Sequence, residues 1–112
     1  MKKDPKIYLI DIVQAIADIY TFSPGMTKED FITNILLQDG ILRKISVIGE
    51  AVKRLPPRLK EKEKDIPWKK ITGMRDVVVH DYSDINLDTI WETVTEDLPK
   101  LNNAVHRMLM RV

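Results

Sequence analysis

The residue types best suited to chemistry lie in one short stretch of the sequence. Arg75, Asp76, His80, Asp81 and Tyr82 fall within eight residues, around a run of three valines. An arginine offers a permanently charged fork for a phosphate, a histidine gives or takes a proton near neutral pH, and a tyrosine donates a hydrogen bond. These types suit cleavage of a phosphodiester by its own 2′-hydroxyl, which requires a base, an acid and a charge clamp but no metal. Composition alone favours a plainer interpretation, a helix with a polar edge.

Metal and cofactor chemistry find little support elsewhere in the sequence. His80 and His106 are the only histidines and cysteine is absent, so the ligand set for a transition metal is weak. The four glycines are scattered and form no phosphate-binding loop. His106 is expected at the surface, where it favours the dipole at the end of a helix. We therefore expect no metal and no cofactor.

Helical geometry separates the two residues that would do the chemistry. Arg75 and Tyr82 are seven residues apart and lie nearly on one face, whereas Arg75 and His80 are five apart, about 140° around an ideal helix. One straight helix therefore does not aim Arg75 and His80 at a single atom. Either the helix ends near His80, or a second copy of the chain contributes across a two-fold interface.

The elements that position this stretch are all expected to be helices. Apolar residues at spacings of three and four predict helices over residues 5–22, 34–55 and 87–110, and a short one over 28–33. Asp4, Thr27 and Asn86 are suited to cap three of them. Three consecutive valines favour a strand within 74–82, but no second strand is available to pair with it, so we expect a helix there too. The fold class is therefore all-α: a single domain over residues 1–112, built as a bundle of four to five helices.

Several details of these helices can be predicted. The buried face of the first helix is expected to include Leu9, Val13, Ile16 and Tyr20, and the helix over 34–55 is expected to continue through Gly40. Residues 58–65 are highly charged and suggest a solvated connector or a loose helical turn, and order resumes after it with a turn through 71–73. Pro99 lies inside the last helix without shifting its apolar phase, so we expect a kink and no break.

Composition and charge narrow the class of protein. The chain has 112 residues, 44% of them apolar and 31% charged, with a net charge of +1. No apolar stretch is long enough for a signal peptide or a membrane span, so a cytoplasmic protein without membrane contact is expected. Residues 43–64 carry a net charge of +5 and residues 81–97 a net charge of −6. These segments are either two solvated faces, a basic surface for a phosphate backbone, or complementary patches between subunits.

The sequence resembles a known family along almost its whole length. Arg75-x4-His80-x-Tyr82 matches the R-x4-H-x-Y motif of the HepT toxins, a branch of the HEPN ribonucleases. Three further stretches are similar to the family in the expected order: the long-helix segment 41–51, which ends in I-G-E-A, the approach I-P-W-K-K-I-T-G-M-R over 66–75, and the final-helix segment 88–99.

This resemblance implies a fold and an activity. The family fold is a helical bundle that dimerises through the motif helices, and the two motifs form a composite, metal-independent RNase site. By this resemblance Arg75 binds and stabilises the scissile phosphate, His80 acts as general base or acid, and Asp76 orients one of them. Tyr82 helps to orient the RNA substrate.

The resemblance also implies a partner. HepT toxins are paired with an MntA-like nucleotidyltransferase antitoxin, which transfers AMP onto the motif tyrosine, here Tyr82, and silences the RNase. Asp76 stands where the family often has Asn, and Asp81 replaces a frequent Gly. An extra acid near the phosphate site is expected to weaken RNA binding. Two alternatives remain open. In the first, the chain is a non-catalytic subunit that docks on a nucleotidyltransferase and presents Tyr82. In the second, it is a plain helical interaction protein.

Overall fold

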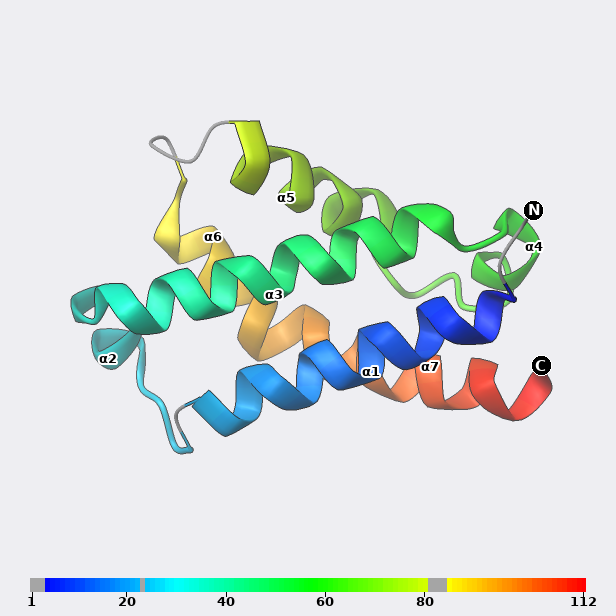
Figure 1. The fold of residues 1–112 in the computed structure, drawn as a ribbon, viewed down its shortest axis with the longest axis horizontal. Helices are drawn as coiled ribbons and strands as arrows, with labels where there is room; N and C mark the ends of the chain where they lie inside the picture. Colours follow the sequence, from blue (N-terminus) through cyan, green and yellow to red (C-terminus); the bar gives the residue numbers. More distant parts are fainter. Residues whose placement is uncertain (1–3, 23, 81–84) are drawn as a thin grey trace.

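The chain forms a bundle of helices in which the longest helix occupies the centre (Figure 1). The computed structural model describes residues 4–22, 24–80 and 85–112, apart from the side chains of Val79 and His80. Within these ranges the chain is helical and contains no strand. The elements are α1 (Pro5–Phe22), α2 (Lys28–Thr33), α3 (Ile35–Arg54), α4 (Pro57–Lys60), α5 (Trp68–His80), α6 (Leu87–Glu92) and α7 (Leu98–Arg111). Helix α3 lies between α1 and α5, and α7 runs along α1. The predicted all-α bundle is confirmed.

The helices begin where the sequence supplies caps. The Lys6 backbone N–H donates to Asp4 Oδ1 at 2.9 Å. Thr27 and Asp30 satisfy each other's backbone N–H groups, at 3.0 and 3.1 Å, as a reciprocal capping box. Asn86 accepts from two backbone N–H groups in the first turn of α6. Each of these side chains replaces the hydrogen bonds that a helix start lacks, so the three predicted starts are confirmed.

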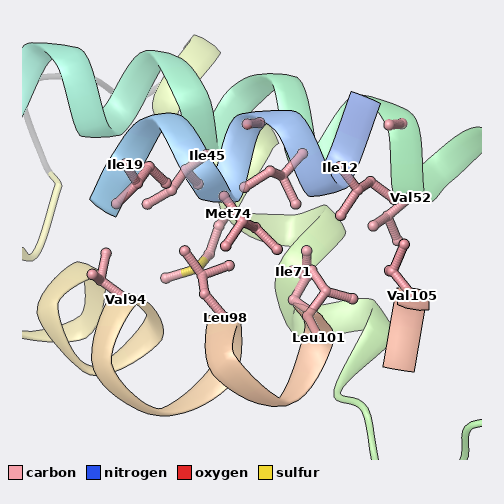
Figure 2. Packing of buried hydrophobic residues seen from close by; sticks show 14 of the residues in the cluster. Ile12, Ile19, Ile45, Val52, Ile71, Met74, Val94, Leu98, Leu101 and Val105 are labelled. Carbon is pink, nitrogen blue, oxygen red and sulfur yellow. The ribbon is translucent and has the colours of Figure 1, made fainter. Parts of the chain in front are cut away.

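The core fills the space between α1, α3, α5 and the last helices (Figure 2). The apolar residues at helical spacing along α3 are all buried: Leu37, Ile41, Ile45, Ile48 and Val52. The helix is continuous through Gly40, as predicted. A Cβ at Gly40 would meet the Phe22 ring at 3.0 Å, which explains a glycine inside this helix. Helix α5 contributes Ile71 and Met74, which Figure 2 shows pointing toward the last helices. This anchoring fixes which side of α5 remains available for a site.

The buried face of α1 lies to one side of the predicted one. The buried stripe comprises Leu9, Ile12, Ala15, Ile16 and Ile19. The prediction for Tyr20 was wrong, because its side chain is 46% exposed, and Val13 is only partly buried. Helix α1 packs against both α3 and α7, so its buried face is centred between those two neighbours.

The segment between α3 and α5 is more ordered than its charge suggests. Residues 57–60 form the short helix α4, which agrees with the predicted helical turn, but Glu63 is buried, so the segment is not solvated throughout. Glu63 accepts from Arg107 Nη2 at 2.7 Å and also pairs with Arg111, while Trp68 Nε1 donates to the Glu63 carbonyl at 3.1 Å. The predicted turn through 71–73 is wrong as well, since α5 is already helical from Trp68.

The last helical segment changes its hydrogen-bond pattern just before Pro99. A π-helical turn, η2 (Thr93–Asp97), joins α6 to α7, and the Leu98 N–H donates to the Thr93 carbonyl. Proline lacks an N–H and its ring crowds the carbonyl four residues earlier, so a wider turn there relieves the conflict. The segment bends between α6 and α7 without breaking, as Figure 1 shows. The predicted kink is confirmed in this form.

Candidate active site

Helix α5 turns one face to the core and the other to solvent. Ile71 and Met74 are buried, while Asp76 and Val77 are exposed. Arg75 lies at the edge between these faces, with its side chain 26% exposed, and it points toward α3. The motif arginine is therefore placed where a solvent-borne substrate can reach it.

The backbones of α3 and α5 approach each other closely at Gly49. A Cβ at this position would lie 2.4 Å from the Cβ of Arg75 and 3.2 Å from the carbonyl oxygen of Ile71. No side chain fits that space without a shift of one helix, so glycine is required by the crossing. The crossing brings Arg75 beside the next residue of α3, which is Glu50.

Two carboxylates hold the Arg75 guanidinium. Its Nε lies 3.2 Å from Glu50 Oε2, and its Nη1 donates to Asp76 Oδ1 at 3.1 Å. Within the ranges that the structure describes, no partner is found for its Nη2. A guanidinium fixed on two sides keeps its remaining N–H groups in a set direction, which suits binding of a phosphate.

Glu50 also holds a second arginine. Its Oε1 accepts from Arg54 Nε at 3.1 Å and lies 3.0 Å from Arg54 Nη2. This hydrogen bond is the main reason that the pKa of Arg54 is raised above its ordinary value. One carboxylate on α3 thus joins a guanidinium of its own helix to the motif guanidinium of α5.

These groups border a cleft between α1, α3 and α5. The cleft has a volume of about 350 Å³, and its lining includes Tyr8, Arg43, Ser46, Arg54 and Arg75. Three arginines against Asp11 and Glu50 give the lining a formal net charge of +1. The motif arginine therefore stands on the wall of a positively charged cavity.

The remaining predicted site residues are described only in part. His80 belongs to α5, five residues and about 7.5 Å of helix rise beyond Arg75, but its side chain is outside the description. Asp81 and Tyr82 lie outside the described residues. That the Arg75 and His80 side chains act on the same phosphate therefore stays a prediction. The contact of Asp76 with Arg75 agrees with the orienting role predicted for it.

Features away from the motif also have clear positions. His106 is exposed, as predicted. In the described part of the chain, no group of three or more His, Asp or Glu side chains is placed to hold a metal ion. No helix there is long and apolar enough to cross a membrane.

Much of the acidic segment over 81–97 is paired within the chain. Lys28 lies 2.8 Å from Asp88, and Lys70 lies 3.3 Å from Glu92 and 2.8 Å from Asp97. The hydrogen bond to Asp97 is the main cause that raises the pKa of Lys70. Carboxylates that pair with lysines of the same chain are less available for a partner. Of the two charged segments, the basic one over residues 43–64 is therefore the better candidate for a binding surface.

Sequence reasoning missed two residues of this site, Gly49 and Glu50. The four-residue spacing of Glu50 and Arg54 is readable as a helical ion pair, and a glycine in mid-helix suggests a close approach. The third partner, Arg75, comes from another helix through a tertiary contact, which no local pattern reveals.

Fold and site together define a class: a small all-helical protein with an arginine held by carboxylates at the crossing of its central helix and a motif helix. The chain belongs to the HepT-like ribonuclease family, since residues 12–108 match the family described as "Ribonuclease HepT-like".

Curated relatives carry names that agree with this family. The chain is 40% identical over 109 residues to the "Gamma-glutamylcyclotransferase and putative RNase" of Methanocaldococcus jannaschii, covering 97% of this chain and 49% of that protein. The chain thus spans about half the length of that relative. It is 38% identical to a "Putative RNase" of Caldanaerobacter subterraneus subsp. tengcongensis, with 97% of both chains covered. It is 35% identical to the "Probable ribonuclease HepT" of Thermococcus cleftensis, covering 96% of this chain and 98% of that one. No solved structure matches the chain significantly.

Proposed function

We propose that this chain is a metal-independent RNA endonuclease and the toxin of a toxin–antitoxin pair. The observation that carries the proposal is the Arg75 guanidinium on the wall of a basic cleft. Glu50 and Asp76 fix it, and its Nη2 has no partner among the residues that the structure describes. Membership of the HepT-like ribonuclease family supports RNA as the substrate. The R-x4-H-x-Y motif supplies His80 on the same helix, and Tyr82 two residues later in the sequence.

The proposed reaction is a transesterification. The 2′-oxygen of the RNA forms a bond to the neighbouring phosphorus, and the bond from that phosphorus to the 5′-oxygen of the next nucleotide breaks. The His80 imidazole of one protomer takes the proton of the 2′-hydroxyl, and the protonated imidazole of the partner's His80 gives a proton to the departing 5′-oxygen. Arg75 binds the phosphate and stabilises the negative charge that builds up on it. The products are a 2′,3′-cyclic phosphate and a 5′-hydroxyl.

The site is proposed to be composite, at a two-fold homodimer interface. The 140° between Arg75 and His80 on one helix argues against their converging within one chain. Val77 lies between them in sequence, and its side chain is 39% exposed on the outer face of α5. An apolar side chain on that face agrees with a second copy of α5 packed against it.

The proposed regulation acts through Tyr82. A cognate MntA-like nucleotidyltransferase in the cytoplasm would join the Tyr82 oxygen to the α-phosphorus of ATP, with loss of the phenolic proton and departure of pyrophosphate. The attached AMP adds bulk and negative charge beside the RNA site, which repels substrate. The competing function, a non-catalytic subunit that only presents Tyr82, needs neither Arg75 nor its carboxylate partners.

Cleavage in EDTA tests the proposed function. The purified protein should cut single-stranded RNA in EDTA at the rate seen with magnesium, and leave 2′,3′-cyclic phosphate ends. His80→Ala, prepared in parallel, should be inactive at unchanged thermal stability, which excludes a contaminating nuclease. Activity that EDTA abolishes and magnesium restores would refute the mechanism. An inactive wild-type protein that still binds its nucleotidyltransferase would favour the non-catalytic subunit.

A further inference from the structure

The cleft beside Arg75 has the size and the chemistry of a ligand site. Its volume of about 350 Å³ falls at the lower end of the range for small-molecule pockets, roughly 300 to 1,000 Å³. Arg43, Ser46 and Arg54 line it from α3, Tyr8 from α1 and Arg75 from α5. The cavity therefore extends away from the motif helix, along the surface of the central helix.

The positive charge of this cleft is only partly used within the chain. Glu50 is shared by Arg54 and Arg75, and Asp76 also pairs with Arg75, so two carboxylates face these two guanidinium groups. Arg43 is exposed and makes no ion pair or hydrogen bond with any other residue that the structure describes. Each guanidinium has five N–H donors, which leaves several for an anion.

An aromatic ring completes the lining. Tyr8 is partly buried against the core, and it borders the same cavity as the three arginines. Aromatic rings stack on bases of any sequence, and arginines along a groove track the phosphates of a single strand. A ring and several guanidinium groups around one cavity match the two ends of a nucleotide.

We propose that this cleft binds the nucleotide of the RNA next to the scissile bond. Arg43 and Arg54 lie eleven residues and about 16.5 Å of helix rise apart on α3, and they contact the phosphates on either side of this nucleotide. Tyr8 stacks on its base, and Arg75 joins the cleft to the scissile phosphate. Glu50 is a positioning residue that keeps both Arg54 and Arg75 turned toward the strand. This inference rests on the proposed function, because it assigns a subsite to the same RNA.

Binding of an uncleavable RNA tests the subsite. The probe is a labelled single-stranded 2′-O-methyl RNA of about 16 nucleotides, which keeps bases and phosphates but lacks the attacking hydroxyl. Arg43→Ala and Arg54→Ala should each weaken binding, and each should reduce the slope of log K against log salt by about 0.7, the value for one lost phosphate contact. Lys100→Ala removes one positive charge from the exposed surface of α7, outside the cleft, and should leave the slope unchanged.

Stacking of Tyr8 on a base is tested separately, by the affinity for RNA and its dependence on salt. Tyr8→Ala should weaken binding about five- to hundredfold with no change in the salt slope, whereas Tyr8→Phe, which keeps the ring, should bind as the wild type does. Thermal melts of each variant separate lost binding from lost folding.

The possible failures are distinguishable. A wild-type protein that cleaves and binds RNA, with Arg43→Ala and Arg54→Ala indistinguishable from Lys100→Ala, overturns the subsite and leaves the proposed function standing. The arginine variants could instead bind RNA normally but escape inhibition by the nucleotidyltransferase. That result would assign the cleft to a protein partner and would also overturn the RNA subsite. A wild-type protein without affinity for RNA overturns both.

Discussion

Arg75 is held by its surroundings in a way that lysine could not reproduce. Its Nε faces Glu50 while its Nη1 faces Asp76, at 3.2 and 3.1 Å. A lysine ammonium is a single point charge and cannot face two carboxylates and a phosphate in fixed directions. The sequence predicts Arg75 as the phosphate ligand by type and motif, and it predicts Asp76 as an orienting neighbour. It does not reveal Glu50 as a partner of Arg75, because that contact depends on how two helices cross.

Accessibility of the tyrosines bears on the proposed regulation. Tyr20 was expected on the buried face of the first helix, but it is 46% exposed, with its hydroxyl 3.4 Å from the Val94 carbonyl. Exposure alone therefore does not select Tyr82 among the three tyrosines. The selection must come from the position of Tyr82 two residues after His80.

Tyr82→Phe should block modification. Incubated with the cognate nucleotidyltransferase and ATP, the wild-type protein should gain one or more AMP groups at Tyr82, and the variant should gain none, because it lacks the accepting oxygen. The variant should also stay active in the presence of the antitoxin. Tyr20→Phe is the matched control and should be modified as the wild type is. Peptide mass spectrometry that places AMP on Tyr20 would contradict the assignment and leave the RNase proposal untouched.

At the level of helices, most boundaries could be predicted and most errors concern tertiary partners. Caps and apolar spacing located α1, α2, α3 and the start of α6, because these signals are local. Overriding the strand preference of the three valines was also correct for the part of α5 that is described. Of the two alternatives for residues 58–65, the helical turn is present as α4, but the expected exposure was wrong for Glu63. Its partners Arg107 and Arg111 are more than forty residues away in the sequence, so no local pattern reveals them.

Gly49→Ala should disturb the crossing that places Arg75. The added methyl would sit 2.4 Å from the Arg75 Cβ, so α5 must shift, at a cost of about 1 to 3 kcal/mol in the free energy of unfolding. RNA cleavage should fall along with it. Gly73→Ala is the matched control: nothing lies within 4 Å of a Cβ there, so the variant should gain up to about 1 kcal/mol and keep its activity. Denaturant unfolding measures both. Equal stability of the two variants would mean that the helices do not meet at Gly49.

The Glu63 cluster predicts a dependence of stability on pH. Hydrogen bonding to Arg107, and then to Arg111, lowers the pKa of Glu63 below its ordinary 4.5, despite the opposing effect of burial. A depressed pKa in the folded state stabilises the protein at pH values above 4.5, and that contribution is lost as the pH falls through the folded-state pKa. The cluster therefore ties the α4–α5 connection to α7 at neutral pH and releases it in acid.

Glu63→Gln should lower the free energy of unfolding by about 1 to 3 kcal/mol at pH 7, because it removes charge-assisted hydrogen bonds from a nearly buried group. The difference from the wild type should shrink below pH 4.5, where the wild-type carboxylate begins to lose its charge. Glu61→Gln, at an exposed position on the same connection, should have little effect at any pH. A gap between Glu63→Gln and wild type that is constant from pH 7 to pH 3 would rule out the charge as its source.

The whole molecule has its motif helix at one side of the bundle, where a second copy can reach it. In Figure 1, α5 packs on α3 along one side, and within the described ranges no other long helix covers its far side. Val77 is 39% exposed on α5, midway between Arg75 and His80 in the sequence. If the two-fold axis passes beside α5, the arginines and histidines of two chains meet around it, and the separation of Arg75 from His80 on one helix ceases to be an obstacle.

Val77→Glu should therefore convert a dimer into a monomer and abolish cleavage. Two carboxylates brought together across a two-fold axis repel each other and cannot be buried without a partner. Met110→Glu, with the same change at a side chain that is 88% exposed at the end of α7, should remain a dimer and stay active. Sedimentation velocity at micromolar concentration, with cleavage measured on the same samples, checks both properties. A monomeric wild-type protein with full activity would mean that each chain completes its own site, and His80 would then have to reach the phosphate bound by Arg75 from the same α5.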